Sequence, residues 1–248
     1  MSNDPFFPLL KLHASAIAPL VLVVGDPARA EDASHLLEKA EKVGSNREYV
    51  TYTGMLKGER VTIASHGVGA GGAAVCFEEL ARAGAKAIIR AGTAGALQPP
   101  INDGDLVIAT GAIRDEGVTE RLIPTMYPAI SNYEVLQALQ DAAKTVPEAT
   151  THTGLIMSSD VFYPSAVMPR GWEMWTNSHV AAVEMELSVL LIIAALHNIR
   201  AGGIFVVDGN LTRTQVIDMS DYDPHRNVVS DAKLRMLRIS LNALVRLG

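Results

Sequence analysis

The chain has 248 residues, enough for one large domain or two small ones, and its 48% hydrophobic and 19% charged content is typical of a soluble, well-buried globular protein. A formal net charge of −6 argues against nucleic acid as the main partner, because phosphate backbones bind to basic surfaces. The single cysteine, Cys76, excludes an internal disulfide framework and favours a reducing compartment, so we expect a cytoplasmic protein.

Short apolar runs with glycine or polar residues at their ends predict six strands. In chain order these runs are LVLVVGDPAR (20–29), VTIASHGVG (61–69), AIIRAGTAG (87–95), DLVIATGAI (105–113), HTGLIMSSD (152–160) and GGIFVVDGN (202–210). They are apolar throughout, as strands covered by helices on both faces should be.

Helical patterns with apolar residues three and four apart lie between and after these runs. They cover residues 76–84, 133–146, 184–198 and 231–247, and the first ends on Gly84, a helix-ending signal. The most apolar segment, 180–196, contains Glu184 and Glu186, which indicates a buried element rather than a membrane span. No linker or repeat divides the chain. We therefore expect one α/β domain over residues 1–248, with a mainly parallel or mixed central β-sheet flanked by helices.

Polar side chains stand where several of the predicted strands end. They are Asp26, Arg29, His66, Arg90, Thr93, Asp160 and Asp208. In open α/β sheets the ligand lies outside the carboxyl ends of the strands, so we expect these side chains to converge.

The stretch SHGVGAGG contains the dinucleotide pattern G-x-G-x-x-G, formed by Gly67, Gly69 and Gly72. A dinucleotide site also needs a carboxylate at the end of the next strand, to hold the ribose hydroxyls. That strand is expected to end in Arg90, and no Asp or Glu follows before Asp103. The sequence therefore disfavours NAD, and the glycines have the alternative role of letting a helix pack closely on a strand.

Two glycine turns carry arginines and favour an anion site. GDPAR places Gly25 after a strand and Arg29 in the first turn of a following helix, while RAGTAG provides Arg90 and Thr93. Backbone N–H groups, a hydroxyl and guanidinium groups suit a phosphate-sized anion. Arg47 in SNREY is a third candidate, although a single arginine is more often a solvated surface residue.

Six motifs taken together resemble a known family. VVGDPAR, SNREY, SHGVG…EEL, IIRAGTAG, VEMEL and VVDG are similar, in order and spacing, to the motifs of the hexameric purine nucleoside phosphorylase and uridine phosphorylase family. The NREY, IIRAG and VFYPS segments are particularly similar to members from apicomplexan parasites.

The resemblance implies a role for each matching residue. It implies phosphate binding by Gly25, Arg29, Arg90 and Thr93, with Arg47 from a neighbouring subunit. It implies ribose binding by Met185 and Glu186 with a neighbour's His13, and a base pocket of Ala94, Gly95, Tyr163 and Val183, with His66 and Val68 near the 5′ end of the sugar. Without the family, the acids of EMEL would be interpreted as an ordinary acidic first turn of a helix.

Asp208 matches the general acid of the family. The glycosidic bond breaks through an oxocarbenium-like state while the departing purine gains negative charge, so a carboxyl group at N7 that shares or donates a proton would stabilise the leaving group. Phosphate on the opposite face would be both nucleophile and counter-charge, a division of labour comparable to that in glycosidases. Whether Arg213 assists Asp208 stays open, and we expect the segment after Asp208 to form a lid.

We therefore expect a purine nucleoside phosphorylase activity, with inosine or guanosine and phosphate giving the free base and ribose 1-phosphate. The resemblance implies no metal or organic cofactor, phosphate as co-substrate, and a homohexamer built as a trimer of dimers. The seven histidines also lack the spacing of metal ligands. Three alternatives remain open: a uridine phosphorylase, a nucleosidase that uses water, and a non-catalytic nucleoside- or phosphate-binding protein.

Overall fold

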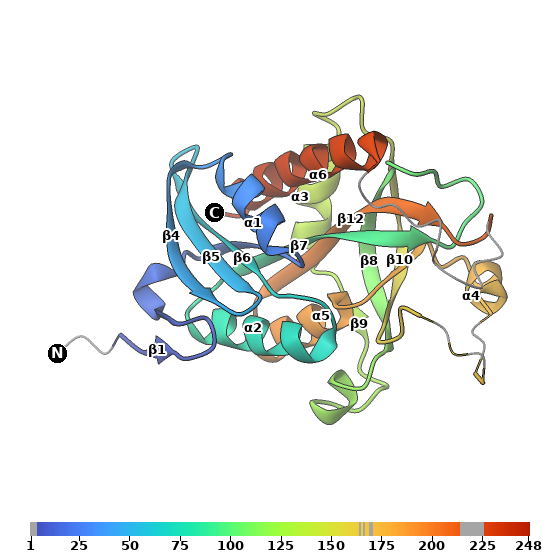
Figure 1. The fold of residues 1–248 in the computed structure, drawn as a ribbon, viewed down its shortest axis with the longest axis horizontal. Coiled ribbons are helices and arrows are strands. Elements are labelled where there is room, and N and C mark those ends of the chain that lie inside the picture. Colours follow the sequence, from blue (N-terminus) through green and yellow to red (C-terminus); the bar gives the residue numbers. More distant parts are fainter. Residues whose placement is uncertain (1–3, 164, 166, 169–170, 214–225) are drawn as a thin grey trace.

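The structure is a computed structural model that describes residues 4–163, 165, 167–168, 171–213 and 226–248 (Figure 1). Its helices are α1 (Pro27–Ser34), α2 (Ala70–Arg82), α3 (Tyr133–Ala143), α4 (Glu173–Asn177), α5 (Leu187–Leu196) and α6 (Asn227–Val245), with short 3₁₀ turns at Ala14–Ala16 and Thr119–Arg121. Its strands are β1 (Phe6–Phe7), β2 (Leu12–His13), β3 (Leu20–Val24), β4 (Glu38–Asn46), β5 (Tyr49–Leu56), β6 (Glu59–Ser65), β7 (Ala87–Ala96), β8 (Leu106–Asp115), β9 (Ala129–Ile130), β10 (Thr151–Ser159), β11 (Ala182–Glu184) and β12 (Arg200–Asn210).

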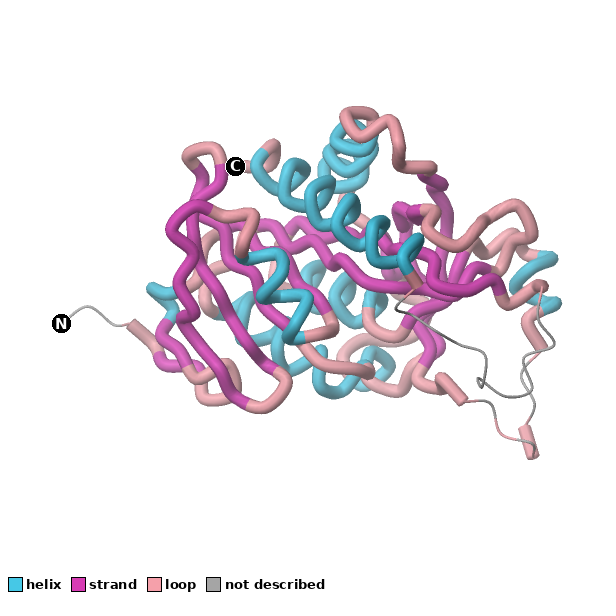
Figure 2. Tube along the Cα trace, turned by 45° about the horizontal axis from the view of Figure 1, so that its top comes forward, coloured by secondary structure: helices cyan, strands magenta, loops and turns pink. Residues whose placement is uncertain are grey.

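The predicted α/β class is confirmed, with a mixed sheet between two layers of helices. Within the described residues the sheet has ten strands, and nine of them follow the order β11-β10-β8-β12-β7-β3-β6-β5-β4. Helices α2 and α5 pack on one face, and α1, α3 and α6 pack on the other, each layer with its own apolar cluster (Figures 1 and 2). Helix α5 is apolar on nearly all sides, as expected for a helix whose residues 187–194 are all buried.

The sheet splits beside β7, and this split positions the site. β3 pairs with β7 in parallel only as far as Val23 opposite Arg90, because β3 ends at Val24. Farther along, β7 pairs instead with β11, where Gly95 lies opposite Val183. Since β11 also pairs with β10, the strands β11, β10, β8, β12 and β7 close into a ring. The open space beside β7 is the kind of place where doubly wound sheets bind ligands.

All six predicted strands and all four predicted helices are present, with differences at their ends. The third strand was expected to end at Arg90, but β7 continues to Ala96 because β11 supplies a new partner where β3 stops. The helix expected from residue 184 begins at Leu187, since Glu184 belongs to β11. The hairpin of β4 and β5 was not predicted, because neither the exposed β4 nor the mostly buried β5 has a continuous apolar run.

Among the described residues, no helix is both long enough and apolar enough to cross a membrane. The apolar run in residues 180–196 is instead divided between β11 and the buried helix α5, as the two glutamates within it indicated.

Candidate active site

A cavity of about 780 Å³ lies at the split beside β7. Most of the residues predicted from the sequence line it: Gly25, Arg29, Val68, Arg90, Thr93, Ala94, Gly95, Tyr163, Val183, Met185, Glu186 and Asp208. They come from loops and strands that are far apart in the sequence, so the expected convergence at the strand ends is observed for these residues.

One end of the cavity is built from the β3–α1 turn and from β7. Asp26 caps helix α1 by accepting a hydrogen bond from the Ala28 N–H at 2.9 Å, with Pro27 at the first helical position. Arg29 follows in the first turn of that helix, and Arg90 and Thr93 face the same cavity from β7. A helix N-terminus beside two guanidinium groups is a suitable environment for an anion.

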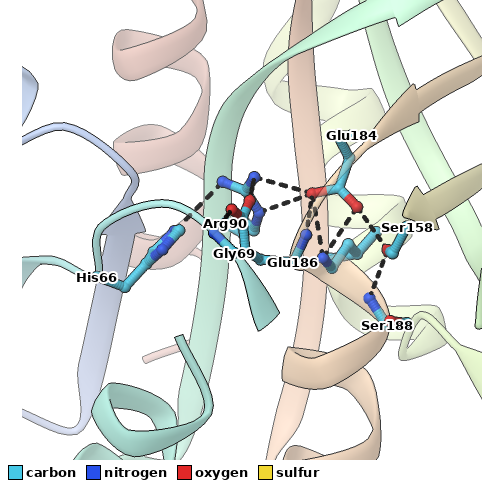
Figure 3. Close-up of polar contacts among 8 residues, drawn as sticks. His66, Gly69, Arg90, Ser158, Glu184, Glu186 and Ser188 are labelled. Atoms are coloured by element: carbon cyan, nitrogen blue, oxygen red, sulfur yellow. Dashed lines mark hydrogen bonds and ion pairs between the residues drawn. The ribbon is translucent and has the colours of Figure 1, made fainter. Parts of the chain in front are cut away.

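Arg90 is a buried cation held by three side chains (Figure 3). Its Nε donates to Glu184 Oε2 at 3.0 Å, and its Nη2 forms an ion pair with the same oxygen at 2.8 Å and also pairs with Glu186. Its Nη1 lies 3.3 Å from His66 Nε2. The guanidinium curls back over its own strand next to Gly92, where a Cβ atom would lie only 2.7 Å from Nη1.

His66 does not line the cavity but lies behind it, fully buried. Burial and the neighbouring Arg90 hold the pKa of His66 well below its usual value of 6.5, so the imidazole is neutral. Because a guanidinium only donates, Nε2 must accept from Arg90 and the ring proton is on Nδ1. The suggested place of His66 near the 5′ end of the sugar stays a prediction.

Glu184 and Glu186 lie on either side of Met185, where β11 passes into α5. Glu184 accepts hydrogen bonds from the N–H groups of Glu186 at 2.9 Å and Leu187 at 3.0 Å, so it caps the start of α5. Glu186 faces the cavity, and burial raises the pKa of its carboxyl group, opposed by the charge of Arg90. The acidic first turn considered for EMEL is not observed, because Glu184 belongs to β11 and Glu186 precedes the first helical residue, Leu187.

The glycine loop between β6 and α2 forms another part of the cavity wall, next to Glu186. Gly67 and Gly69 have φ angles of +75° and +95°, which favour glycine. The Gly69 N–H donates to Glu186 Oε1 at 2.5 Å, and Gly67 and Val68 line the cavity. The loop thus provides a backbone donor and close approach to the cavity at the start of a helix.

Asp208 enters the cavity from a bulge in β12. In the parallel register with β7, Val207 pairs with Ala94 and Gly209 pairs with Gly95, so Asp208 is the extra residue. Bulges of this kind re-aim a side chain and are common next to active sites. Asp208 is only 5% exposed, and its carbonyl oxygen accepts a hydrogen bond from Arg226.

An apolar wall near Asp208 was only partly foreseen. Besides Tyr163 and Val183, the cavity is lined by Val161, Phe162, Trp172 and Leu211. The rings of Phe162 and Tyr163 meet edge to face with centroids 5.0 Å apart. Aromatic faces of this kind suit a planar heterocycle.

Two predicted residues, His13 and Arg47, lie outside the cavity lining. His13 is on β2 and Arg47 is in the β4–β5 turn, both exposed. The two segments are neighbours, because Asn46 Nδ2 donates to the Leu9 carbonyl at 2.8 Å. Their proposed contribution to another subunit's site stays a prediction.

Sequence reasoning missed several residues at the site. Glu184 and Glu48 line the cavity. The sequence identified Glu184 only as an acid within an apolar segment. Its position two residues before Glu186 was the available signal that it belongs to the site. Asp160, expected at the site, instead accepts a hydrogen bond from the Gly117 N–H. Arg213 donates to the Pro99 carbonyl and to Asn102 and does not line the cavity; most of the expected lid, residues 214–225, lies outside the described residues.

Among the described residues, no group of three or more His, Cys, Asp or Glu side chains is arranged to hold a metal ion. The cavity groups that can bind a ligand are two arginines, five carboxylates (Asp26, Glu48, Glu184, Glu186 and Asp208), backbone N–H groups and an aromatic wall.

Fold and cavity together define an α/β protein whose cavity is lined by arginines, carboxylates and an apolar wall. Residues 19–246 match the phosphorylase superfamily, and the chain belongs to this family. It is 38% identical over 240 residues to a purine nucleoside phosphorylase of Plasmodium vivax, covering 96% of each chain. It is also 38% identical over 211 residues to a uridine phosphorylase of Treponema pallidum, covering 82% of this chain and 81% of the other.

Among solved structures, the chain is similar to a purine nucleoside phosphorylase from Toxoplasma gondii in complex with immucillin-H. The TM-score is 0.92 at 33% sequence identity, over 100% of this chain and 98% of that one. The resemblance expected from the six sequence motifs is thereby confirmed.

Proposed function

We propose that the protein is a purine nucleoside phosphorylase, which converts a purine nucleoside and inorganic phosphate to the free base and ribose 1-phosphate. One observation carries this proposal: a single cavity joins an arginine-lined anion end, a buried carboxylate and an aromatic wall with Asp208 beside it. The relatives named purine nucleoside phosphorylase, matched along almost the whole chain, support the same conclusion.

Phosphate is assigned to the end formed by Gly25, Arg29, Arg90 and Thr93. Two guanidinium groups, a hydroxyl and the N-terminus of α1 would balance its charge. Held against one face of the sugar, the phosphate would attack the anomeric carbon as the bond to the base breaks, and its charge would stabilise the oxocarbenium-like sugar.

The sugar is assigned to Met185 and Glu186. An ionised Glu186 would accept hydrogen bonds from the 2′- and 3′-hydroxyls, while Met185 would pack on the sugar. The same carboxylate pairs with Arg90 and the Gly69 N–H. The sugar hydroxyls would therefore bind to oxygens that Arg90 and the glycine loop also hold in position.

The base is assigned to the pocket of Ala94, Gly95, Tyr163 and Val183, where Asp208 would reach N7 of a purine. Protonation or hydrogen bonding at N7 would stabilise the departing anion. The reaction would need no metal and no organic cofactor, because phosphate is the co-substrate.

We further infer a homohexamer, a trimer of dimers in which His13 and Arg47 complete the neighbouring subunit's site. Their exposed positions, outside the lining of their own cavity, support this assignment. The cytoplasmic location inferred from the single cysteine stays a prediction.

The experiment that tests the function measures hypoxanthine released from inosine by the purified protein, with saturating phosphate and with phosphate omitted. We expect release that requires phosphate and yields ribose 1-phosphate in equal amount. Release of ribose without phosphate would identify a nucleosidase instead. Nucleoside or phosphate binding in calorimetry, without turnover of any nucleoside, would identify a binding protein.

A second candidate, a uridine phosphorylase, is favoured by the relative from Treponema pallidum. The same assay with uridine separates the two functions, because a purine enzyme should have the higher kcat/KM with inosine. A higher kcat/KM with uridine would overturn the purine assignment while leaving phosphorolysis intact.

A further inference from the structure

Glu184 is a fully enclosed carboxylate that connects the anion end of the cavity to its sugar end. Its side chain is only 1% exposed, compared with 4% for Arg90 and 5% for Glu186. Figure 3 shows it between Arg90 on one side and Ser158 on the other. The general acid, phosphate, sugar and base assignments above do not use it.

Among the described residues, every hydrogen-bond partner of this carboxylate is a donor. Oε1 accepts from the Ser158 hydroxyl at 2.5 Å and from the Leu187 N–H at 3.0 Å. Oε2 accepts from Arg90 Nε at 3.0 Å and from the Glu186 N–H at 2.9 Å. The ionised form of the carboxyl group fits this arrangement, because both of its oxygens act only as hydrogen-bond acceptors.

The orientation of Ser158 is fixed as well. Its oxygen accepts the Ser188 N–H at 2.9 Å, so its own proton is directed at Glu184 Oε1. Ser188 lies in the first turn of α5, and Ser158 lies near the end of β10. Two different elements therefore hold the face of Glu184 that is turned away from Arg90.

We infer that Glu184 is a positioning residue, which holds the Arg90 guanidinium in place for phosphate and fixes the backbone of Glu186 through one shared oxygen. Arg90 pairs with Glu186, which the proposed function assigns to the sugar hydroxyls, and with Glu184, whose side chain is 1% exposed and is also held by β10 and α5. When substrates engage Glu186 and Arg90, the hydrogen bond from Nε and the ion pair of Nη2 with Glu184 would keep the guanidinium in place. This inference rests on the proposed function, in which Arg90 binds phosphate.

The decisive variant is Glu184→Gln, which preserves size but introduces an NH₂ group. With the amide nitrogen in the Oε2 position, the NH₂ group meets the Arg90 and Glu186 N–H donors and cannot donate to them. With the nitrogen in the Oε1 position it meets the Leu187 N–H, and Arg90 keeps only a neutral amide oxygen. In both orientations the Arg90 guanidinium loses its charged partner. We expect the Kd for inorganic phosphate, measured by calorimetry, and the KM for phosphate to rise by about 10- to 100-fold.

Glu116→Gln is the matched control. Glu116 is also a buried carboxylate that accepts only from donors, including the Val118 and Thr119 N–H groups and the Ser188 hydroxyl in the same first turn of α5. Among the described residues, no hydrogen bond or ion pair joins Glu116 to Arg90 or Glu186. We expect it to lower thermal stability and to leave the phosphate Kd within about twofold of wild type.

The outcomes separate the possibilities. An unchanged phosphate Kd in Glu184→Gln overturns the inference, and so does tighter binding, which would mean that Glu184 only neutralises Arg90. An equal loss in Glu116→Gln also overturns it, because the effect would then come from the start of α5. If Glu184→Gln does not fold, Ser158→Ala decides: we expect a rise of about three- to tenfold in the phosphate Kd, and no change overturns the inference.

The wild-type protein distinguishes this test from the test of function. Failure of wild type to bind phosphate or to use it would count against the proposed function. Phosphate-dependent turnover in wild type, combined with an unaffected Glu184→Gln, would count against the positioning role alone.

Discussion

Asp208 shows how a bulge can direct the side chain of a single residue into a site. The strand β12 is buried along most of its length, and the bulge aims one carboxyl group into the cavity without ending the strand. A general acid at this place needs a fixed direction toward the base, and the register shift supplies it.

Replacing Asp208 by alanine should lower kcat with inosine by about 10²- to 10⁴-fold, the usual contribution of a positioned acid. The phosphate end of the cavity would be intact, so the KM for phosphate should change by less than about threefold. Steady-state kinetics measure both values. Asp141→Ala, an exposed aspartate on α3 paired with Lys144, serves as a control and should retain full activity. A loss of less than tenfold in Asp208→Ala would contradict the general-acid role.

His66 gives the protein a pH-dependent stability with a definite sign. The unfolded chain takes up a proton on this residue below its usual pKa of 6.5, whereas the folded protein, with its lowered pKa, stays neutral. The unfolded state then binds more protons, so the free energy of unfolding falls as the pH drops below 6.5, by about 1.4 kcal/mol per unit.

Urea denaturation at pH 7.5 and pH 5.5 measures this contribution. Between these pH values, wild type should lose about 1 kcal/mol more stability than His66→Gln, which has no proton to take up. The glutamine can still accept a hydrogen bond from Arg90. Equal losses in the two proteins would show that His66 is not kept neutral by the fold.

At the scale of elements, the site depends on where strands stop. β3 pairs with β7 only as far as Arg90, and β11 joins that edge of β7 only at Gly95, while β12 stays paired along the other edge; the interval between them opens the space that becomes the cavity. Gly92 lies in this interval, and its missing side chain is where the Arg90 guanidinium lies.

Gly92→Ala should therefore damage phosphate binding without unfolding the sheet. The new Cβ would lie 2.7 Å from Nη1 and 3.0 Å from Cζ of Arg90, which are atoms of a side chain that can move away. We expect the KM for phosphate to rise about tenfold or more, since a displaced guanidinium loses charge-assisted hydrogen bonds.

Gly71→Ala is the matched glycine control. Its Cβ would meet nothing within 4 Å, and the residue lies in α2, where alanine is preferred over glycine. Thermal melts should show a gain of about 0.5–1 kcal/mol with unchanged kinetics. If Gly92→Ala binds phosphate as well as Gly71→Ala does, the geometry assigned to Arg90 is wrong.

At the scale of the whole molecule, the exposed positions of His13 and Arg47 lead to a test of shared sites. The variants Arg47→Ala and Arg90→Ala should each be nearly inactive as pure proteins. Mixed after reversible dissociation, they should recover activity, because a hybrid pair contains one site with both arginines intact. Random pairing predicts roughly a quarter of the wild-type specific activity. Size-exclusion chromatography should show the same assembly for all three samples, and no recovery in a mixed assembly would mean that each subunit forms its site alone.

The sequence by itself determined much of this protein, because the relevant signals are local. Apolar runs predicted β3, β6, β7, β8, β10 and β12, periodic patterns predicted α2, α3, α5 and α6, and glycine turns marked Gly25, Arg29, Arg90 and Thr93 as candidates for anion binding. The absence of an acid after the glycine loop was enough to disfavour a dinucleotide.

Only the tertiary structure decided which partners these residues have. Glu184 looks like one more acid in an apolar segment until β7 and β10 bring Arg90 and Ser158 to it from 94 and 26 residues away. The strand through Arg90 continues past its expected end because β11, a later segment, provides hydrogen bonds there. Pairings of this kind depend on the packing of distant segments, and a local pattern carries no information about them.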